Sequence, residues 1–117
     1  MIIAQITDIH LGFDPDTPDE FNRQRLDRIL ARLDTGPNRP VALLATGDLT
    51  DQGAPDSYAR LAEALAGRDW AIIPCVGNHD VRTHFSAHFP GLDDEQGFIQ
   101  YVRDIGPLRL IGIDTLE

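Results

Sequence analysis

Three short apolar segments, each followed directly by a polar cluster, constrain the fold of this chain more than any other feature. The segments span residues 2–7, 41–46 and 70–76. The clusters that follow them are Asp8-Ile9-His10, Gly47-Asp48-Leu49-Thr50-Asp51 and Gly77-Asn78-His79-Asp80. Apolar runs of this length that end in turn residues are typical of buried strands. Because stretches with helical spacing separate them, the sequence predicts an α/β fold with a mainly parallel sheet and right-handed crossovers.

The first intervening helix is predicted to begin at Thr17. Thr17 can cap the helix, Pro18 suits the first helical position, and Glu20 can close a capping box. Its apolar positions recur at helical spacing, and Gly36 is a plausible end. These inward positions are Leu26, Ile29, Leu30 and Leu33.

Two further helices and a pair of strands are predicted downstream. A second helix is expected from near Pro55 to Leu65, and a short third helix around residues 83–89. Strands at 98–103 and 108–113 flank the pair Gly106-Pro107, which is typical of a tight turn. The C-terminal segment is therefore expected to form an antiparallel hairpin.

Composition narrows the classes of function. The chain has 117 residues, with 19 acidic and 10 basic side chains and a net charge of −9, and its length fits one domain or part of one. Such acidity does not suit binding to a nucleic-acid backbone or to an anionic membrane surface. Neither a signal peptide nor a membrane-spanning run is apparent, so we expect a cytoplasmic protein. The single cysteine, Cys75, excludes an intrachain disulfide and is expected to be a buried, unreactive thiol.

The polar clusters suggest a metal site. Ligands of parallel α/β sheets collect at the carboxyl ends of the strands, so the three clusters should meet at one edge. Asp8 and His10 lie two apart in an extended segment and can share one ion. Asp48 could bridge two ions, and Asn78 offers an amide oxygen. One Asp-x-His alone is more often a solvated loop, but three clusters in this order favour Mn, Fe or Zn.

The motifs Asp8-x-His10, Gly47-Asp48-x-x-Asp51 and Gly77-Asn78-His79-Asp80 resemble the first three motifs of the calcineurin-like metallophosphoesterases. The resemblance covers essentially the whole chain. It is strongest to the branch of class III cyclic-nucleotide phosphodiesterases and glycerophosphodiesterases. The closing segment 110–115 of this chain also resembles that branch. It implies a four-layer α/β/β/α sandwich, of which residues 1–117 would form the N-terminal part of one domain, with the C-terminal part absent.

The resemblance implies metal-dependent hydrolysis of phosphodiesters by a centre of two divalent or trivalent transition-metal ions. Asp8 and His10 would hold the first ion, Asp48 would bridge both, and Asn78 would hold the second. The substrate would be a small cyclic nucleotide or glycerophosphodiester.

The remaining assignments concern the substrate. Asn78 and His79 would contact its phosphate, and His79 would donate a hydrogen bond or protonate the leaving group. Asp51 would orient His79, and we expect a hydrogen bond between their side chains. Arg82 could also contact the phosphate, although a salt bridge with a nearby Asp is an equal alternative. Asp80 is expected to cap a loop, and Asp114 to be structural with no assigned partner.

The family completes its site with a further histidine and a Gly-His-x-His motif, which this chain lacks. His84 and His88 could share a helix face and bind a metal, but inward packing of Phe85 and Phe89 with solvated histidines is the plainer account. We therefore expect the chain alone to be inactive, to bind at most one ion, and to self-associate through an uncovered sheet face. Alternatives are a non-catalytic, metal-poor half-domain, or a phosphomonoesterase or nuclease of the same superfamily.

Overall fold

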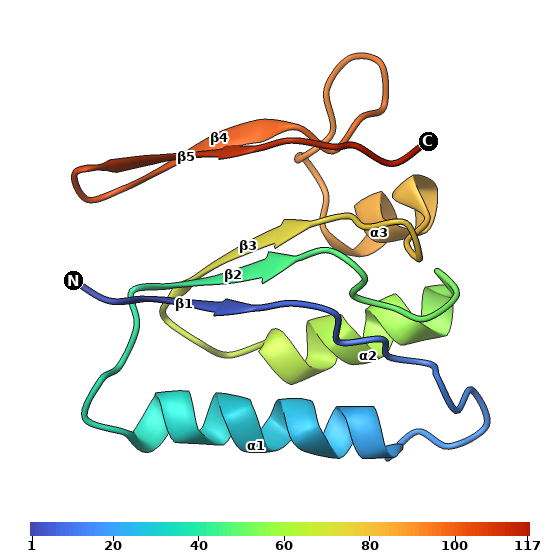
Figure 1. Ribbon diagram of the computed structural model, residues 1–117, viewed down its shortest axis with the longest axis horizontal. Coiled ribbons are helices and arrows are strands. Elements are labelled where there is room, and N and C mark those ends of the chain that lie inside the picture. The colour runs from blue at the N-terminus through green and yellow to red at the C-terminus, as the bar shows by residue number, and fades with distance from the viewer.

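A three-stranded parallel sheet forms the centre of the computed structural model, which describes all residues 1–117 (Figure 1). Its strands β1 (Ile3–Ile6), β2 (Ala42–Thr46) and β3 (Ala71–Cys75) are adjacent in the order β1-β2-β3. Ile3 is paired with Ala42, which is in turn paired with Ala71. The predicted parallel arrangement of these three segments is confirmed, and their carboxyl ends lie at one edge.

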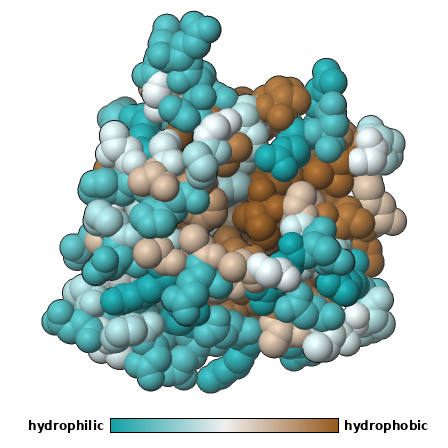
Figure 2. All heavy atoms as spheres, turned by 180° about the vertical axis from the view of Figure 1, so that it is seen from behind, coloured by the Kyte–Doolittle hydropathy of each residue, from teal (hydrophilic) through white to brown (hydrophobic).

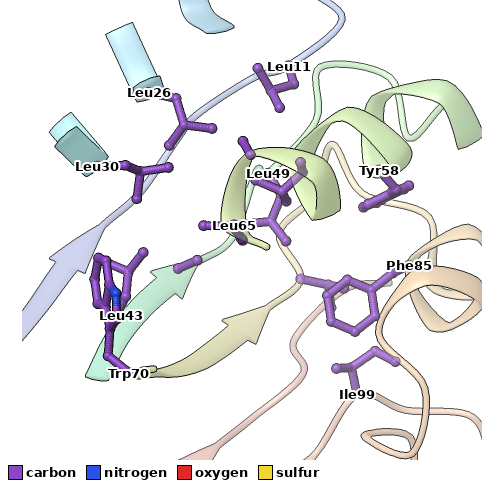
Figure 3. Packing of buried hydrophobic residues seen from close by; sticks show 14 residues of the cluster. Leu11, Leu26, Leu30, Leu43, Leu49, Tyr58, Leu65, Trp70, Phe85 and Ile99 are labelled. Carbon is purple, nitrogen blue, oxygen red and sulfur yellow. The ribbon is translucent and has the colours of Figure 1, made fainter. Parts of the chain in front are cut away.

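Two helices, α1 (Phe21–Thr35) and α2 (Pro55–Leu65), lie on the same side of this sheet (Figure 1). The bounds predicted for the second helix are confirmed. Figure 3 shows Leu26 and Leu30 of α1 and Leu65 of α2 directed into the layer between helices and sheet, where Leu43 of β2 also lies. The largest fully buried side chains belong mainly to this layer and its continuation toward the strand ends: Tyr58, Phe85, Leu11, Leu30, Leu43, Leu49, Leu61 and Ile99.

Helix α1 begins later than predicted, so the capping box at Thr17 was wrong. Glu20 is the residue that precedes the helix, and its side chain makes no capping hydrogen bond. Instead its buried carboxylate accepts hydrogen bonds from the backbone amides of Gly12, at 2.7 Å, and Asp14, at 3.3 Å. A buried carboxylate needs such donors, and the loop after β1 supplies them. The end of the helix at Gly36 is confirmed by its amide, which donates to the carbonyl of Arg32 at 2.9 Å.

The C-terminal part contains a short helix α3 (Arg82–His88) and the antiparallel strands β4 (Tyr101–Ile105) and β5 (Leu108–Gly112). The hairpin with its turn at Gly106 is confirmed. Strand β4 begins three residues after the expected position. The amides of Phe98 and Ile99 donate to the carboxylates of Asp94, at 3.0 Å, and Asp114, at 2.8 Å, rather than to a neighbouring strand.

The β4–β5 hairpin lies on the side of the parallel sheet opposite to α1 and α2 (Figure 1). It contacts β3 through the Tyr101 hydroxyl, which donates to the carbonyl of Pro74 at 2.5 Å. Its other face is open to solvent and carries the exposed apolar side chains Val102, Ile111 and Ile113 beside the exposed ion pair of Asp104 and Arg109. Figure 2 shows that apolar side chains gather on the back of the molecule. No helix has the length and apolar character required to cross a membrane.

Candidate metal centre

The first two polar clusters run side by side beyond the ends of β1 and β2. The amide of His10 donates to the carbonyl of Asp48 at 3.0 Å, and that of Leu11 to Leu49 at 3.1 Å. The amide of Asp51 returns a hydrogen bond to the carbonyl of Leu11 at 2.9 Å, and Leu11 forms a parallel bridge with Thr50. The sheet pairing is thereby extended into the loops, and this extension holds the two clusters in register.

Three of the predicted metal ligands have a left-handed backbone conformation. Their φ angles are +55° for Asp8, +50° for His10 and +49° for Asp48. Residues with a Cβ rarely adopt this conformation, although Asp and His tolerate it better than most. Such residues concentrate at functional sites, where the surrounding structure holds the strained conformation in place. Here all three strained residues lie in the loops that follow β1 and β2, at the edge predicted to bind metal.

The side chains of these three residues converge. His10 Nε2 lies 3.7 Å from Asp8 Oδ1 and 3.7 Å from Asp48 Oδ2. On the other side of the ring, His10 Nδ1 donates a hydrogen bond to Asp51 Oδ1 at 3.1 Å. A histidine that donates through Nδ1 to a carboxylate presents the lone pair of Nε2, as metal-binding histidines do. The donor set of one imidazole and two carboxylates therefore fits a transition-metal ion.

The third cluster approaches this group through Gly77. A Cβ at position 77 would lie 2.3 Å from Asp48 Oδ1 and 2.4 Å from the amide nitrogen of Asp48, so only glycine permits the contact. The amide of His79 then donates to Asp48 Oδ1 at 2.9 Å. Asn78 lines an open hollow of about 640 Å³ together with Asp8 and Asp48. The structure thus brings Asp8, Asp48 and Asn78 to one hollow. The fourth predicted ligand, His10, lies beside it, with Nε2 3.7 Å from the carboxylates of Asp8 and Asp48.

Asp80 holds the second and third clusters together. Its buried carboxylate accepts hydrogen bonds from the amides of Leu49 and Thr50, each at 3.1 Å, and of Gly77 at 2.8 Å. The hydroxyl of Tyr58, in α2, donates to the same carboxylate at 2.9 Å. Burial and the neighbouring Asp80 raise the pKa of Tyr58, so the phenol remains a donor at neutral pH. The expectation that Asp80 caps a loop is confirmed.

The prediction of a hydrogen bond between the Asp51 and His79 side chains was wrong. His79 Nδ1 donates to the backbone carbonyl of Asp51 at 2.7 Å, whereas the Asp51 carboxylate lies 4.0 Å from that nitrogen. The carboxylate instead accepts a hydrogen bond from His10 Nδ1. The His10 ring lies edge-on to that of His79, with the ring centroids 4.8 Å apart. The hydrogen bond to the Asp51 carbonyl, assisted by the charges of Asp48, Asp51 and Asp80, raises the pKa of His79.

Arg82 has a partner that the sequence did not reveal. Its guanidinium donates from Nε to Asp114 Oδ2 at 2.8 Å and from a terminal nitrogen to Asp114 Oδ1 at 2.9 Å. The salt bridge weighed for Arg82 is therefore present, and Asp114 is its partner. The position of Asp114 directly after a strand, as for Asp8 and Asp48, was the one available signal.

Two other predictions concern residues near the site. His84 Nδ1 donates to the carbonyl of Gly53 at 2.7 Å and His88 Nδ1 to that of His84 at 3.2 Å, while Phe85 is fully buried. Inward packing of Phe85 is thus confirmed, and the two histidines do not converge on a common point with other ligands. Cys75 is half-buried, and burial raises the pKa of its thiol, as expected for an unreactive cysteine.

Carboxylates and imidazoles gathered at the carboxyl edge of a parallel α/β sheet are suited to hold metal ions, and ligands of such sheets bind at this edge. Residues 1–115 match the family model of the calcineurin-like phosphoesterases, and the chain belongs to this family. The chain is 36% identical to a probable cyclic nucleotide phosphodiesterase of Rhodococcus erythropolis, covering 97% of the chain and 39% of that protein.

Two further relatives extend this comparison. A probable cyclic nucleotide phosphodiesterase of Rhodopseudomonas palustris is 32% identical over 100% of the chain and 43% of its own length. A probable glycerophosphodiester phosphodiesterase of Arcobacter nitrofigilis is 25% identical over 98% of the chain and 44% of its own length. The chain therefore spans less than half the length of these curated relatives. The predicted resemblance to the branch of cyclic-nucleotide and glycerophosphodiester phosphodiesterases is confirmed.

Proposed function

We propose that the protein containing this chain hydrolyses phosphodiesters, of the cyclic nucleotide or glycerophosphodiester type, with a dinuclear metal centre. One observation carries this proposal: His10 Nε2 faces the carboxylates of Asp8 and Asp48. The hydrogen bond from His10 Nδ1 to the Asp51 carboxylate holds the ring in this orientation. Membership of a phosphoesterase family that uses divalent metal ions supports it. The names of the relatives support the diester class over monoesters.

In this proposal Asp8 and His10 would hold the first ion, Asn78 would hold the second, and Asp48 would contribute to both. Oxygen and imidazole donors suit Mn, Fe or Zn. When bound, such a pair of ions supplies Lewis acidity and an acidified water for attack on phosphorus. The chain itself contributes the fixed orientation of the ligands, because Asp51, Asp80 and the paired loops hold them before any ion binds.

Asn78 and His79 are assigned to the substrate. His79 Nδ1 donates its hydrogen bond to the Asp51 carbonyl. Nε2 is therefore the ring nitrogen that remains free to contact the phosphate or its leaving oxygen. The raised pKa of His79 increases the fraction of imidazolium near neutral pH, which favours donation of a proton to a leaving group. Asp51 thus acts on both histidines, through its carboxylate for His10 and through its carbonyl for His79.

The second ion has only Asp48 and Asn78 within residues 1–117. Catalytic metal sites commonly keep about three protein ligands per ion and an open position. We therefore assign residues 1–117 to the N-terminal part of one metallophosphoesterase domain, in which further histidines complete the second site. On its own, the 117-residue chain should bind at most one ion, weakly, and should be inactive.

Calorimetric titration with Mn²⁺, combined with an assay of a chromogenic phosphodiester, tests this assignment. It compares the 117-residue chain with the extended protein, defined as residues 1–117 together with the rest of the domain. The extended protein should bind two ions and hydrolyse the diester, and Asp48→Asn should abolish both properties. A chromogenic monoester measured in parallel distinguishes a phosphomonoesterase. Two tightly bound ions in the short chain, or an inactive extended protein that binds none, would contradict the proposal.

A further inference from the structure

The side chain of Asp114, directly after β5, is completely buried. Its two oxygens accept four hydrogen bonds: two from the Arg82 guanidinium, one from the amide of Ile99 at 2.8 Å and one from the amide of Leu116 at 2.9 Å. The hydrogen bond from Arg82 lowers the pKa of Asp114, so the carboxylate remains ionised at neutral pH. A buried charge with this set of partners forms a rigid connection.

Arg82 completes the connection from its own side. Besides the fork to Asp114, it donates a hydrogen bond to the carbonyl of Leu116, and its guanidinium lies over the ring of Phe98, 4.9 Å from the centroid. The pair therefore joins three parts of the chain. These are the start of α3 directly after the third polar cluster, the segment that enters β4, and the segment that leaves β5.

The segment leaving β5 forms one side of the candidate site. Thr115, Leu116 and Glu117 line the same hollow of about 640 Å³ as Asp8, Asp48 and Asn78. Leu116 is held by both members of the ion pair, through its amide and its carbonyl. No strand pairing includes residues 114–117, so these two hydrogen bonds tie the backbone of this wall to the rest of the site.

We propose that Arg82 and Asp114 are positioning residues, which hold the segment 115–117 as a wall of the substrate hollow. Arg82 then affects the reaction through this wall and not by direct contact with the phosphate. This inference rests on the proposed function. The two possible roles of Arg82 predict opposite effects of removing the charge of Asp114. If Arg82 positions the wall, the change damages substrate binding; if Arg82 binds phosphate, the change releases its guanidinium for that contact.

The experiment compares Arg82→Gln, Asp114→Asn and the double variant in the extended protein loaded with Mn²⁺. A displaced wall should raise the KM for the phosphodiester about tenfold in each single variant and change kcat by about twofold or less. The double variant should show no more than the larger single effect, because both changes break the same contact. An unchanged or lowered KM in Asp114→Asn would overturn the inference, as would additive effects of the two changes.

Matched controls and a conservative variant protect this test against general destabilisation. Asp104→Asn and Arg109→Gln remove the equivalent fork on the exposed side of the hairpin and should leave KM unchanged. Arg82→Lys keeps the charge and should recover part of the lost substrate binding, with a KM raised by about threefold. If Arg82→Gln fails to fold, Arg82→Lys together with Asp114→Asn decides the question.

A second measurement separates failure of this inference from failure of the proposed function. Hydrogen exchange at the Leu116 amide, in the same proteins without metal, should accelerate at least tenfold in Arg82→Gln and Asp114→Asn but not in the controls. Inorganic phosphate should also bind about tenfold more weakly to the Mn²⁺-loaded variants than to the parent. If the parent hydrolyses no diester but these two shifts appear, the proposed function is wrong and the positioning role of Arg82 and Asp114 is supported. If the parent is active and neither shift appears, the positioning role of Arg82 and Asp114 is wrong.

Discussion

The parallel sheet and the β4–β5 hairpin are both built from strands of four or five residues, yet they are buried to different degrees. In β2, Ala42, Leu43 and Ala45 are fully buried between the helices on one side and the hairpin on the other. No residue of β4 or β5 is buried to that extent. The candidate metal ligands follow the three strands of the parallel sheet. The site is therefore built on the part of the molecule with the densest core, which favours precise placement of its side chains.

Truncation of a core residue should show the largest difference between the two regions. Leu43→Ala removes a fully buried side chain from β2 and should lower the free energy of unfolding by about 3 kcal/mol. Ile111→Ala, at a position 68% exposed in β5, should change it by about 0.5 kcal/mol or less. Urea denaturation followed by circular dichroism measures both. Equal losses for the two variants would show that the hairpin belongs to the same core.

The two Arg–Asp forks should sharpen the comparison, because one is buried and the other is exposed on the hairpin. Asp114→Asn leaves Arg82 and two backbone amides without a charged acceptor and should lower the free energy of unfolding by about 2 kcal/mol. Asp104→Asn should cause no measurable loss, since its fork with Arg109 is surrounded by solvent. Chemical denaturation of the two variants side by side is the measurement. A larger loss in Asp104→Asn would contradict the difference in burial.

Acid should act on the buried fork in a defined direction. Because the hydrogen bond from Arg82 lowers the pKa of Asp114, the stability contributed by this carboxylate is fully present above its unfolded pKa of about 4. It is lost as the pH falls through the lower pKa of the folded state. The difference in melting temperature between the parent and Asp114→Asn should therefore be constant above about pH 5 and shrink below about pH 4. A difference that grows on acidification would contradict this assignment.

The left-handed conformation of Asp8 gives a smaller effect at the site itself. Both Asp8→Gly and Asp8→Ala remove the carboxylate, but only Gly adopts a φ of +55° without strain. Without metal, Asp8→Gly should be more stable than Asp8→Ala by about 1 kcal/mol, while both lose affinity for Mn²⁺. Thermal unfolding and calorimetric titration provide the two measurements. Equal stability of the two variants would mean that the backbone relaxes at this position.

The smallest change in stability is expected on the outer face of the hairpin. Ile111→Lys places a charge among the exposed apolar side chains Val102 and Ile113 and should leave the free energy of unfolding within about 0.5 kcal/mol of the parent. It should nevertheless reduce self-association of the 117-residue chain, because exposed apolar strands promote pairing. Sedimentation velocity over a range of concentrations measures this. A parent chain that remains monomeric at high concentration would contradict the expected association.

The features that followed from the sequence depend on local patterns. The length of the apolar runs marked the buried strands, and helical spacing marked the helices between them. The polar residues after each strand marked the edge where Asp8, His10, Asp48 and Asn78 meet. The features that were missed depend on hydrogen-bond partners outside the local pattern. The Glu20 carboxylate accepts a hydrogen bond from the amide of Gly12 instead of capping its own helix. The Asp51 carboxylate accepts one from His10 and not from His79.

Two further features needed coordinates for the same reason. The Arg82–Asp114 pair joins residues 32 positions apart, and neither residue carries a local signature of its partner. The left-handed φ angles at three of the ligands arise from the pairing of the loops after β1 and β2, which no propensity of single residues predicts. Sequence patterns identified the elements, whereas hydrogen bonds between loops determined which side chains face each other.

The left-handed backbone at Asp8, His10 and Asp48 also bears on the choice of metal. Positions with such φ angles accept Gly, Asn, Asp and His far more readily than branched or bulky residues. The backbone therefore selects short side chains with oxygen or imidazole donors at these positions before any ion is present. Engineering toward soft metals would need thiolates at strained positions, so a change of metal preference in this scaffold would require rebuilding the loops and not the ligands alone.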